Sequence, residues 1–317
     1  MKKRAIIIAV ILVLVGIAVF AAAFVVSGFD FSKFAIDEYE TNTYEVSENF
    51  DKIEINTKES NITFKPSEDG VCRLVCTEKN VKHSVNVENG TLKIVSEDKR
   101  EWYDYITFFS KSLSMTVYLP ANFYEEFNIN GSTGDVQIPE SFSAGSIDIK
   151  VSTGDIVCKA SVSGSILLKT GTGDIDIKEM AAGSVAISVS TGRVDVEKVS
   201  CEEDFSVKVG TGKAKLTDLT CKNFDSTGGT GNISLKNVVA ADNFKIERST
   251  GDVNFENCDA DQIDIKTSTG DITGTIKTAK IFTAKTSSGS VRVPESESGG
   301  KCKLTTSSGD ISVDIIG

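Results

Sequence analysis

The chain has 317 residues, of which 40% are hydrophobic and 25% are charged, and its formal net charge is −11. This apolar fraction is typical of a folded protein and too high for a disordered chain. The acidic balance excludes nucleic acid as an expected partner, because a negative surface repels phosphate backbones. A single histidine, His83, excludes most sites built on paired imidazoles and most His-rich metal sites.

An uncharged, apolar stretch runs from Ala5 to Val26 near the N-terminus. As a helix its 22 residues reach roughly 33 Å, enough for a hydrocarbon core of about 30 Å. Three cationic residues at positions 2–4 precede the stretch and acidic residues follow it. By the positive-inside tendency, we expect residues 1–26 to form a cytoplasmic start and a single-pass membrane anchor, with the remaining chain extracytoplasmic.

A cleaved signal peptide is the alternative, with Ala21–Ala23 as its small-residue cleavage site. The apolar run continues past that site and exceeds the usual core of about 7–15 residues, which favours the anchor. Both alternatives place the body of the protein outside the membrane. Residues 27–48, which are polar and acidic, are predicted to be a juxtamembrane linker.

A repeat of 19 or 20 residues governs residues 131–317. Each unit contains a glycine that follows Thr or Ser, and an apolar residue stands two positions after each of these glycines and seven positions before it. The glycines, called corner glycines below, are Gly134, Gly154, Gly173, Gly192, Gly212, Gly231, Gly251, Gly270, Gly289 and Gly309. An aspartate follows the corner glycine in six of the units.

Apolar and polar residues alternate within each unit, as in Ile147-Asp148-Ile149, which predicts short strands with one buried face. One unit cannot bury that face alone, whereas coiling places each apolar position above its equivalent in the next unit. Glycine at the repeated corner suits a backbone with positive φ. The sequence therefore predicts an all-β, right-handed parallel β-solenoid, similar to a β-helix, of about ten coils.

Two other folds share parts of this pattern. Leucine-rich repeats have a period of about 20–29 residues, but these units lack the Leu/Asn pattern. An antiparallel meander with Gly-Asp hairpins alternates in the same way. A meander does not explain why alternate turns differ while one turn type keeps a fixed period, so the solenoid is the preferred interpretation.

Residues 49–130 carry strand patterns without the strict repeat, and we expect irregular coils with an N-terminal cap there. An aromatic segment within this region either plugs the end of the core or forms an exposed binding loop for sugar, lipid or protein. Its aromatic residues are Trp102, Tyr103, Tyr105, Phe108 and Phe109.

The C-terminal end stops soon after Ile311, Val313 and Ile315, without a polar capping unit. We expect this last coil to leave a free strand edge, which would permit end-to-end self-association.

The aspartates that follow the corner glycines are predicted to stack along one corner as an acidic ladder. Its members are Asp135, Asp155, Asp174, Asp252 and Asp271. Such a ladder could hold Ca²⁺, but the nonapeptide pattern of calcium-binding repeats is absent, so the preferred interpretation is that each Asp closes its own turn. No metal, cofactor or catalytic residue is predicted. Cys201 and Cys221 hold equivalent positions on successive units and are the candidate disulfide pair, whereas the odd total of seven argues against a complete disulfide framework.

The positively flanked apolar stretch, the Leu119-Pro120 strand end and the serial Ser-Thr-Gly-Asp units together resemble the bacterial putative-adhesin β-strand-repeat family (domain of unknown function 4097). The resemblance covers roughly residues 49–317. It implies a cell-envelope protein with a β-solenoid ectodomain, common in Gram-positive bacteria, with members linked to envelope stress responses. It supplies no catalytic motif. Arg193, Lys213, Asn232 and Ser290 depart from the Asp of the family unit.

Three functional hypotheses follow. The first is a non-enzymatic, membrane-tethered binding protein that contacts wall polymer or another envelope protein. The second is a regulatory ectodomain of an envelope-stress system. The third is a polysaccharide-acting β-helix enzyme, which serial, nearly identical coils with short turns disfavour.

Overall fold

The computed structural model describes residues 2–26, 39–78, 81–98 and 113–316. The apolar stretch forms the helix α1 (Lys2–Val26). Within the described ranges, no helix combines the length and the apolar character that crossing a bilayer requires. The membrane anchor therefore stays a prediction.

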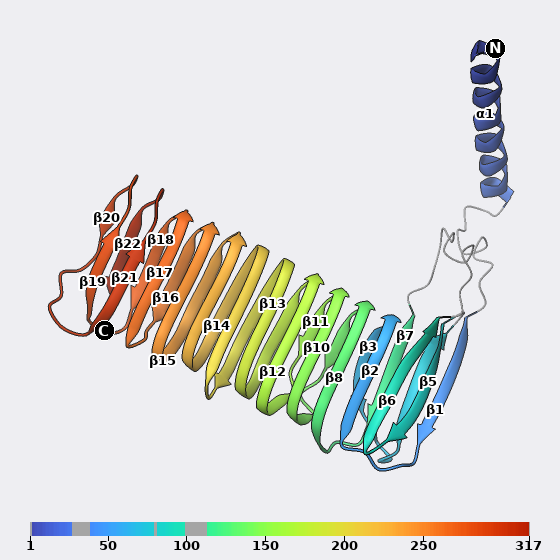
Figure 1. Cartoon of the computed structure of the whole chain (residues 1–317), viewed down its shortest axis with the longest axis horizontal. Coiled ribbons are helices and arrows are strands. Elements are labelled where there is room, and N and C mark those ends of the chain that lie inside the picture. The colour runs from blue at the N-terminus through green and yellow to red at the C-terminus, as the bar shows by residue number, and fades with distance from the viewer. Residues whose placement is uncertain (1, 27–38, 79–80, 99–112, 317) are drawn as a thin grey trace.

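All other regular elements of the described chain are strands, which stack into one long rod (Figure 1). They are β1 (Glu40–Val46), β2 (Lys52–Glu59), β3 (Asn61–Pro66), β4 (Cys72–Glu78), β5 (Val81–Glu88), β6 (Thr91–Asp98), β7 (Ser114–Leu119), β8 (Phe123–Thr133), β9 (Val136–Ile138), β10 (Ser143–Thr153), β11 (Ile156–Cys158), β12 (Ser161–Thr172), β13 (Ile175–Cys201), β14 (Asp204–Thr230), β15 (Ile233–Thr250), β16 (Val253–Cys258), β17 (Gln262–Thr269), β18 (Ile272–Ile276), β19 (Lys280–Lys285), β20 (Val291–Arg292), β21 (Gly300–Thr305) and β22 (Ile311–Ile315).

Parallel pairing between successive coils confirms the β-solenoid. In the register, Ile147 lies between Phe127 and Ile166, and Gly192 lies opposite Gly212. Except at Phe282 and Val291, these apolar repeat residues are buried in one continuous core that extends along the rod. Within this core Phe224 stacks on Phe205 and packs at a tilt against Phe244, with ring centroids 6.2 and 4.9 Å apart respectively.

The corner glycines have φ between 126° and 147°, a backbone that L side chains rarely adopt. They also stack in direct contact. A Cβ built on Gly212 would lie 1.8 Å from the carbonyl oxygen of Gly192, and the other corner glycines meet the layer beneath at similarly short distances. Both the dihedral angle and the lack of space therefore require glycine at this corner.

A second corner lies six residues after five of the corner glycines, where non-glycine residues adopt left-handed backbone with φ of 53–55°. Asn and Asp tolerate this conformation because their short side chains hydrogen-bond locally. Here they bond between coils: Asn237 Nδ2 donates to Asp218 Oδ1 at 2.6 Å, and Asn257 Nδ2 donates to Asn237 Oδ1 at 3.2 Å.

The N-terminal end of the rod is not layered in chain order. The coil of β2 and β3 pairs on one side with β8 and β9 and on the other with β6 and β7. Antiparallel pairings then close this end, joining β5 to β6, β7 to β4 and β4 to β1. These strands form the cap in which the candidate site lies.

The C-terminal end is also layered out of chain order. Strands β21 and β22 pair with β17 and β18 on one side and with β19 and β20 on the other. The expectation of a free edge is therefore wrong at Ile311, where β22 pairs with both β18 and β20. Val313 and Ile315 pair with β18 on one side only. The outermost coil is instead that of β19 and β20, where Ile281 and Val291 are 45% exposed.

A buried ion pair links the coils on either side of the inserted coil of β21 and β22. Lys280 Nζ, on the outermost coil, lies 2.8 Å from Asp259 Oδ1, and the two side chains are 4% and 11% exposed. In the register, Gly300 lies between Lys280 and Asp261, so the lysine passes a residue that has no side chain. The ion pair thus ties the outermost coil to the layer beneath the inserted one.

Candidate functional site

The acidic ladder exists, but its hydrogen bonds run between layers. Asp135 Oδ1 accepts the backbone N–H of Asp155 at 2.9 Å, and Asp155 Oδ1 accepts that of Asp174 at 2.7 Å. Asp252 Oδ1 accepts the N–H of Asp271 at 3.1 Å in the same way. The interpretation that each Asp closes its own turn is therefore wrong: each carboxylate supports the equivalent turn of the next coil.

An asparagine takes the place of the aspartate at the start of each consecutive series of ladder aspartates. Asn61 Oδ1 accepts the backbone N–H of Asp135, and Asn232 Oδ1 accepts that of Asp252, both at 3.0 Å. The first series ends where Asp174 accepts from the backbone N–H of Arg193 and pairs with its guanidinium at 3.2 Å. An amide serves as well as a carboxylate at this position, which indicates a structural role for the ladder.

The predicted aromatic loop cannot be placed. Its five residues, Trp102, Tyr103, Tyr105, Phe108 and Phe109, lie outside the residues that the structure describes. Both interpretations, core plug and binding loop, remain predictions.

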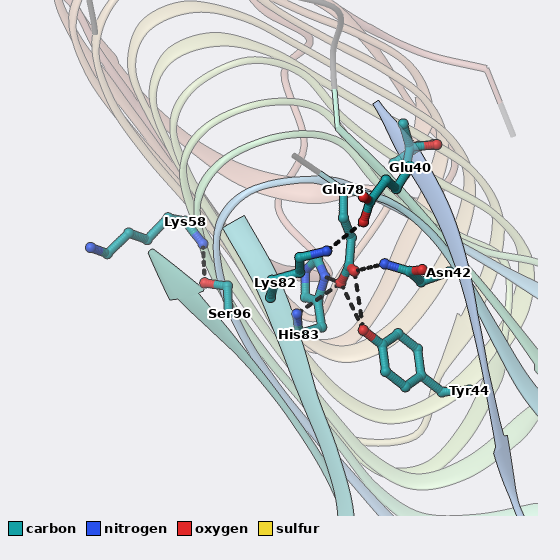
Figure 2. Close-up of polar contacts among 10 residues, drawn as sticks. Glu40, Asn42, Tyr44, Lys58, Glu78, Lys82, His83 and Ser96 are labelled. Carbon is teal, nitrogen blue, oxygen red and sulfur yellow. Dashed lines mark hydrogen bonds and ion pairs between the residues drawn. The ribbon is translucent and has the colours of Figure 1, made fainter. Parts of the chain in front are cut away.

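A cluster of buried polar side chains, none of them among the predicted site residues, lies in the N-terminal cap (Figure 2). Alternate residues of β4 face inward, which buries Cys76 and Glu78. His83, on β5, is buried against them, and its Nδ1 lies 2.6 Å from Glu78 Oε1 while its backbone N–H donates to the same oxygen at 2.8 Å. The neighbouring β1 contributes Asn42 and Tyr44, whose side chains donate to the Glu78 carboxylate at 2.5 and 3.1 Å.

The electrostatics of this cluster favour a charged Glu78. Burial opposes its ionisation, but the hydrogen bonds from Asn42, His83 and Tyr44 outweigh burial and hold the pKa of Glu78 below its ordinary value. Burial, together with the charge of Glu78, raises the pKa of Tyr44 to about 12. Burial and the same charge also raise the pKa of the Cys76 thiol to about 12. The cluster therefore holds one charged carboxylate that accepts hydrogen bonds from Asn42, Tyr44 and the backbone N–H of His83.

The sequence carries a signal for this cluster in the inward residues of β4 and β5, outside the repeat. Cys72, Leu74, Cys76 and Glu78 are the alternate, buried residues of β4, so an acid continues the apolar face of the strand. His83 likewise follows Val81 on the inward face of β5. A charged residue at an inward position requires partners, because a buried unpaired charge is costly.

All seven cysteines are free and buried, so the candidate pair Cys201 and Cys221 is not joined. Burial alone raises the pKa of Cys72 to about 12. Burial raises the pKa of Cys258 to about 11 and of Cys302 to about 12. Such thiols are protonated at neutral pH and act as small core residues rather than nucleophiles.

The sequence matches the model of one known family, Toastrack DUF4097, over residues 50–203 and 201–317. The chain belongs to this family. No curated protein matches the chain.

Several solved structures resemble this Toastrack chain at low identity. A putative adhesin from Bacteroides fragilis is 14% identical, with a TM-score of 0.42, and the match covers 88% of this chain and 97% of that one. A putative lipid binding protein from Parabacteroides distasonis is 16% identical, with a TM-score of 0.48 and coverage of 87% and 97%. A putative cell adhesion protein from Clostridium sporogenes is 9% identical, with a TM-score of 0.26 and coverage of 87% and 99%.

Proposed function

We propose that this Toastrack protein is a membrane-anchored, extracytoplasmic rod that acts as a non-enzymatic binding surface of the bacterial cell envelope. Residues 5–26 are the proposed anchor, because they are uncharged and are flanked by cations on the N-terminal side and acids on the other. The rod would extend from this anchor toward the cell wall or a neighbouring envelope protein.

The observation that best supports a binding role is the register of outward side chains. Lys215, Ser234, Asn254, Thr273 and Ser312 occupy equivalent positions on five successive layers. They line one open polar groove together with Lys236, Glu256, Thr275 and Asp314. We call this surface the polar groove.

Layers in such a stack repeat at about 4.8 Å, so the polar groove offers cationic, hydroxyl and amide groups at a constant interval. An extended polymer with regularly spaced polar groups could contact several layers at once, and each contact would raise the effective concentration for the next. A single reaction centre would need no such repetition. The polar groove therefore favours an extended ligand such as wall polymer.

Retention of the purified full chain on isolated cell-wall material tests this proposal. Lys215→Glu places a like charge in the polar groove if the polymer is anionic, and we expect it to weaken retention several-fold. Lys208→Glu is the matched control, because Lys208 is also exposed on β14 but does not line the groove. Equal retention of the two variants would contradict the proposed surface.

Capture from intact membranes tests the regulatory alternative. A single stable signalling partner, with no retention on wall material, would support a regulatory ectodomain and overturn the binding role. Comparison of the full chain with one lacking residues 1–26, in membrane and soluble fractions, tests the anchor. Release of the full chain by high salt would contradict it, since an integral helix resists salt extraction.

A further inference from the structure

Three ligand-type side chains meet inside the N-terminal cap. The sulfur of Cys76, a carboxylate oxygen of Glu78 and a ring nitrogen of His83 all lie within 4.8 Å of one another. Cys76 and Glu78 are two residues apart on β4 and so point to the same side, while His83 comes from β5. All three residues are buried.

The mixture of donor atoms is informative. Thiolate, imidazole and carboxylate are the ligands that Zn²⁺ takes in proteins. Calcium and magnesium prefer sets made only of oxygen, so sulfur and nitrogen donors disfavour them. The chemistry of the cluster thus suits a borderline transition metal, with Zn²⁺ as the representative ion.

His83 supplies an independent observation. Its side chain is fully buried, and Nδ1 is engaged with Glu78 Oε1. The other ring nitrogen, Nε2, has no hydrogen-bond partner within the described ranges. Buried polar atoms are rarely left without a partner, and each such case requires an explanation. Coordination of a metal ion by the imidazole would explain the unpartnered nitrogen.

Hydrogen bonds from Asn42 and Tyr44 already orient the Glu78 carboxylate, as outer residues do around a metal ligand. Glu78 Oε2 accepts from Asn42 Nδ2, and both carboxylate oxygens accept from Tyr44 Oη at 3.1 Å. Such outer partners fix the orientation of a metal ligand and influence its basicity. Because Asn42 and Tyr44 lie on β1, the shell joins a third strand to the cluster.

We propose that Cys76, Glu78 and His83 form a zinc-class metal site that staples β4 to β5 in the N-terminal cap. On binding, the Cys76 thiol releases its proton to solvent and coordinates as thiolate. The direct hydrogen bond between His83 and Glu78 gives way to coordination by a ring nitrogen and a carboxylate oxygen. Water completes the tetrahedral set. Metal binding would then contribute directly to folding of the cap, independently of any ligand in the polar groove.

Zinc content of the purified full chain, freed of metal with a chelator and reloaded with Zn²⁺ alone, is the test. We expect one equivalent of Zn²⁺ to remain after desalting. With Co²⁺ as the probe, we expect a thiolate-to-metal charge-transfer band. Cys76→Ser and His83→Gln should each lose both the retained equivalent and the band. Cys72→Ser is the matched control, because Cys72 is a second free, buried thiol on the inward face of β4.

X-ray absorption at the zinc edge of the unmodified chain decides the matter even if a variant does not fold. One sulfur at about 2.3 Å, with nitrogen and oxygen ligands, is the expected shell. A shell without sulfur, or with two or more sulfurs, would overturn the proposal. Failure of the unmodified chain to retain Zn²⁺, or equal loss in Cys72→Ser, would overturn it as well.

Discussion

Replacement of a single corner glycine by alanine should destabilise the rod far more than the change of one methyl group suggests. Gly212 has φ of +140°, and an added Cβ would lie 1.8 Å from the carbonyl oxygen of Gly192. Ordinary Cβ contacts begin at 3.4 Å, so the methyl group overlaps backbone that cannot rotate away. Relief requires the two layers to separate at this corner.

The magnitude has two parts. Holding an alanine at this dihedral angle costs about 1–3 kcal/mol. Separation of the layers weakens the hydrogen bonds around the paired residues Gly192 and Gly212, each worth about 1 kcal/mol. We therefore expect Gly212→Ala to lower the free energy of unfolding by about 3–5 kcal/mol.

Gly70→Ala is the control that measures backbone strain without steric overlap. Gly70 also has positive φ, +74°, but a Cβ there meets nothing within 4 Å. Its cost should be about 1–2 kcal/mol, from the backbone alone. Urea denaturation of the two variants measures the difference, and hydrogen exchange should show lost amide protection centred on the layers around Gly212. If Gly212→Ala destabilises the chain no more than Gly70→Ala, the steric argument for the corner is refuted.

Other positions give further tests. Asp155→Ala should cost about 1 kcal/mol in urea denaturation, whereas Asp155→Asn should leave stability unchanged because an amide oxygen can accept the same N–H; equal loss in both variants would show that the charge matters. Lys280→Ala should cost about 3–5 kcal/mol and speed hydrogen exchange in residues 300–315, while Lys285→Ala on the exposed side of β19 should change neither. In the native protein, thiol reagents should react slowly with all seven cysteines, and unfolding without reductant should release seven equivalents; five would indicate a Cys201–Cys221 disulfide.

The middle of the rod was predictable because one physical requirement repeats there. An apolar residue fixed in position relative to each corner glycine must lie above its equivalent, so Ile147 and Ile166 define the register without further information. The positive φ of the corner was predictable from the repeated glycine alone.

The ends were less predictable for the same reason. Because all coils are nearly equivalent, the pattern around Ile311 and Val313 suits an inner layer as well as a final one. The order of the strands in the sequence then suggested that β22 is outermost, whereas it lies between β18 and β20. The signals that decide the arrangement are single departures: Lys280, whose buried amine needs Asp259, and Gly300, whose missing side chain lets the lysine pass.

The candidate site could not be predicted from the repeat, because Cys76, Glu78 and His83 lie in the irregular region before it. As the single histidine, His83 argued against a His-rich metal site, yet Glu78 and Cys76 lie five and seven residues earlier on β4. The acidic ladder was found, but the direction of its hydrogen bonds could not be read from one unit, since the acceptor and donor belong to different layers.

The threading of both ends limits how a protein of this kind can change its length. A duplicated unit in the middle would bring its own glycine and its own apolar residues, and the layers on either side would accept it unchanged. A unit appended after Ile315 would have to continue from an inner layer whose two neighbours are already in place. Shorter and longer homologues should therefore differ by whole units in the middle, with both ends conserved.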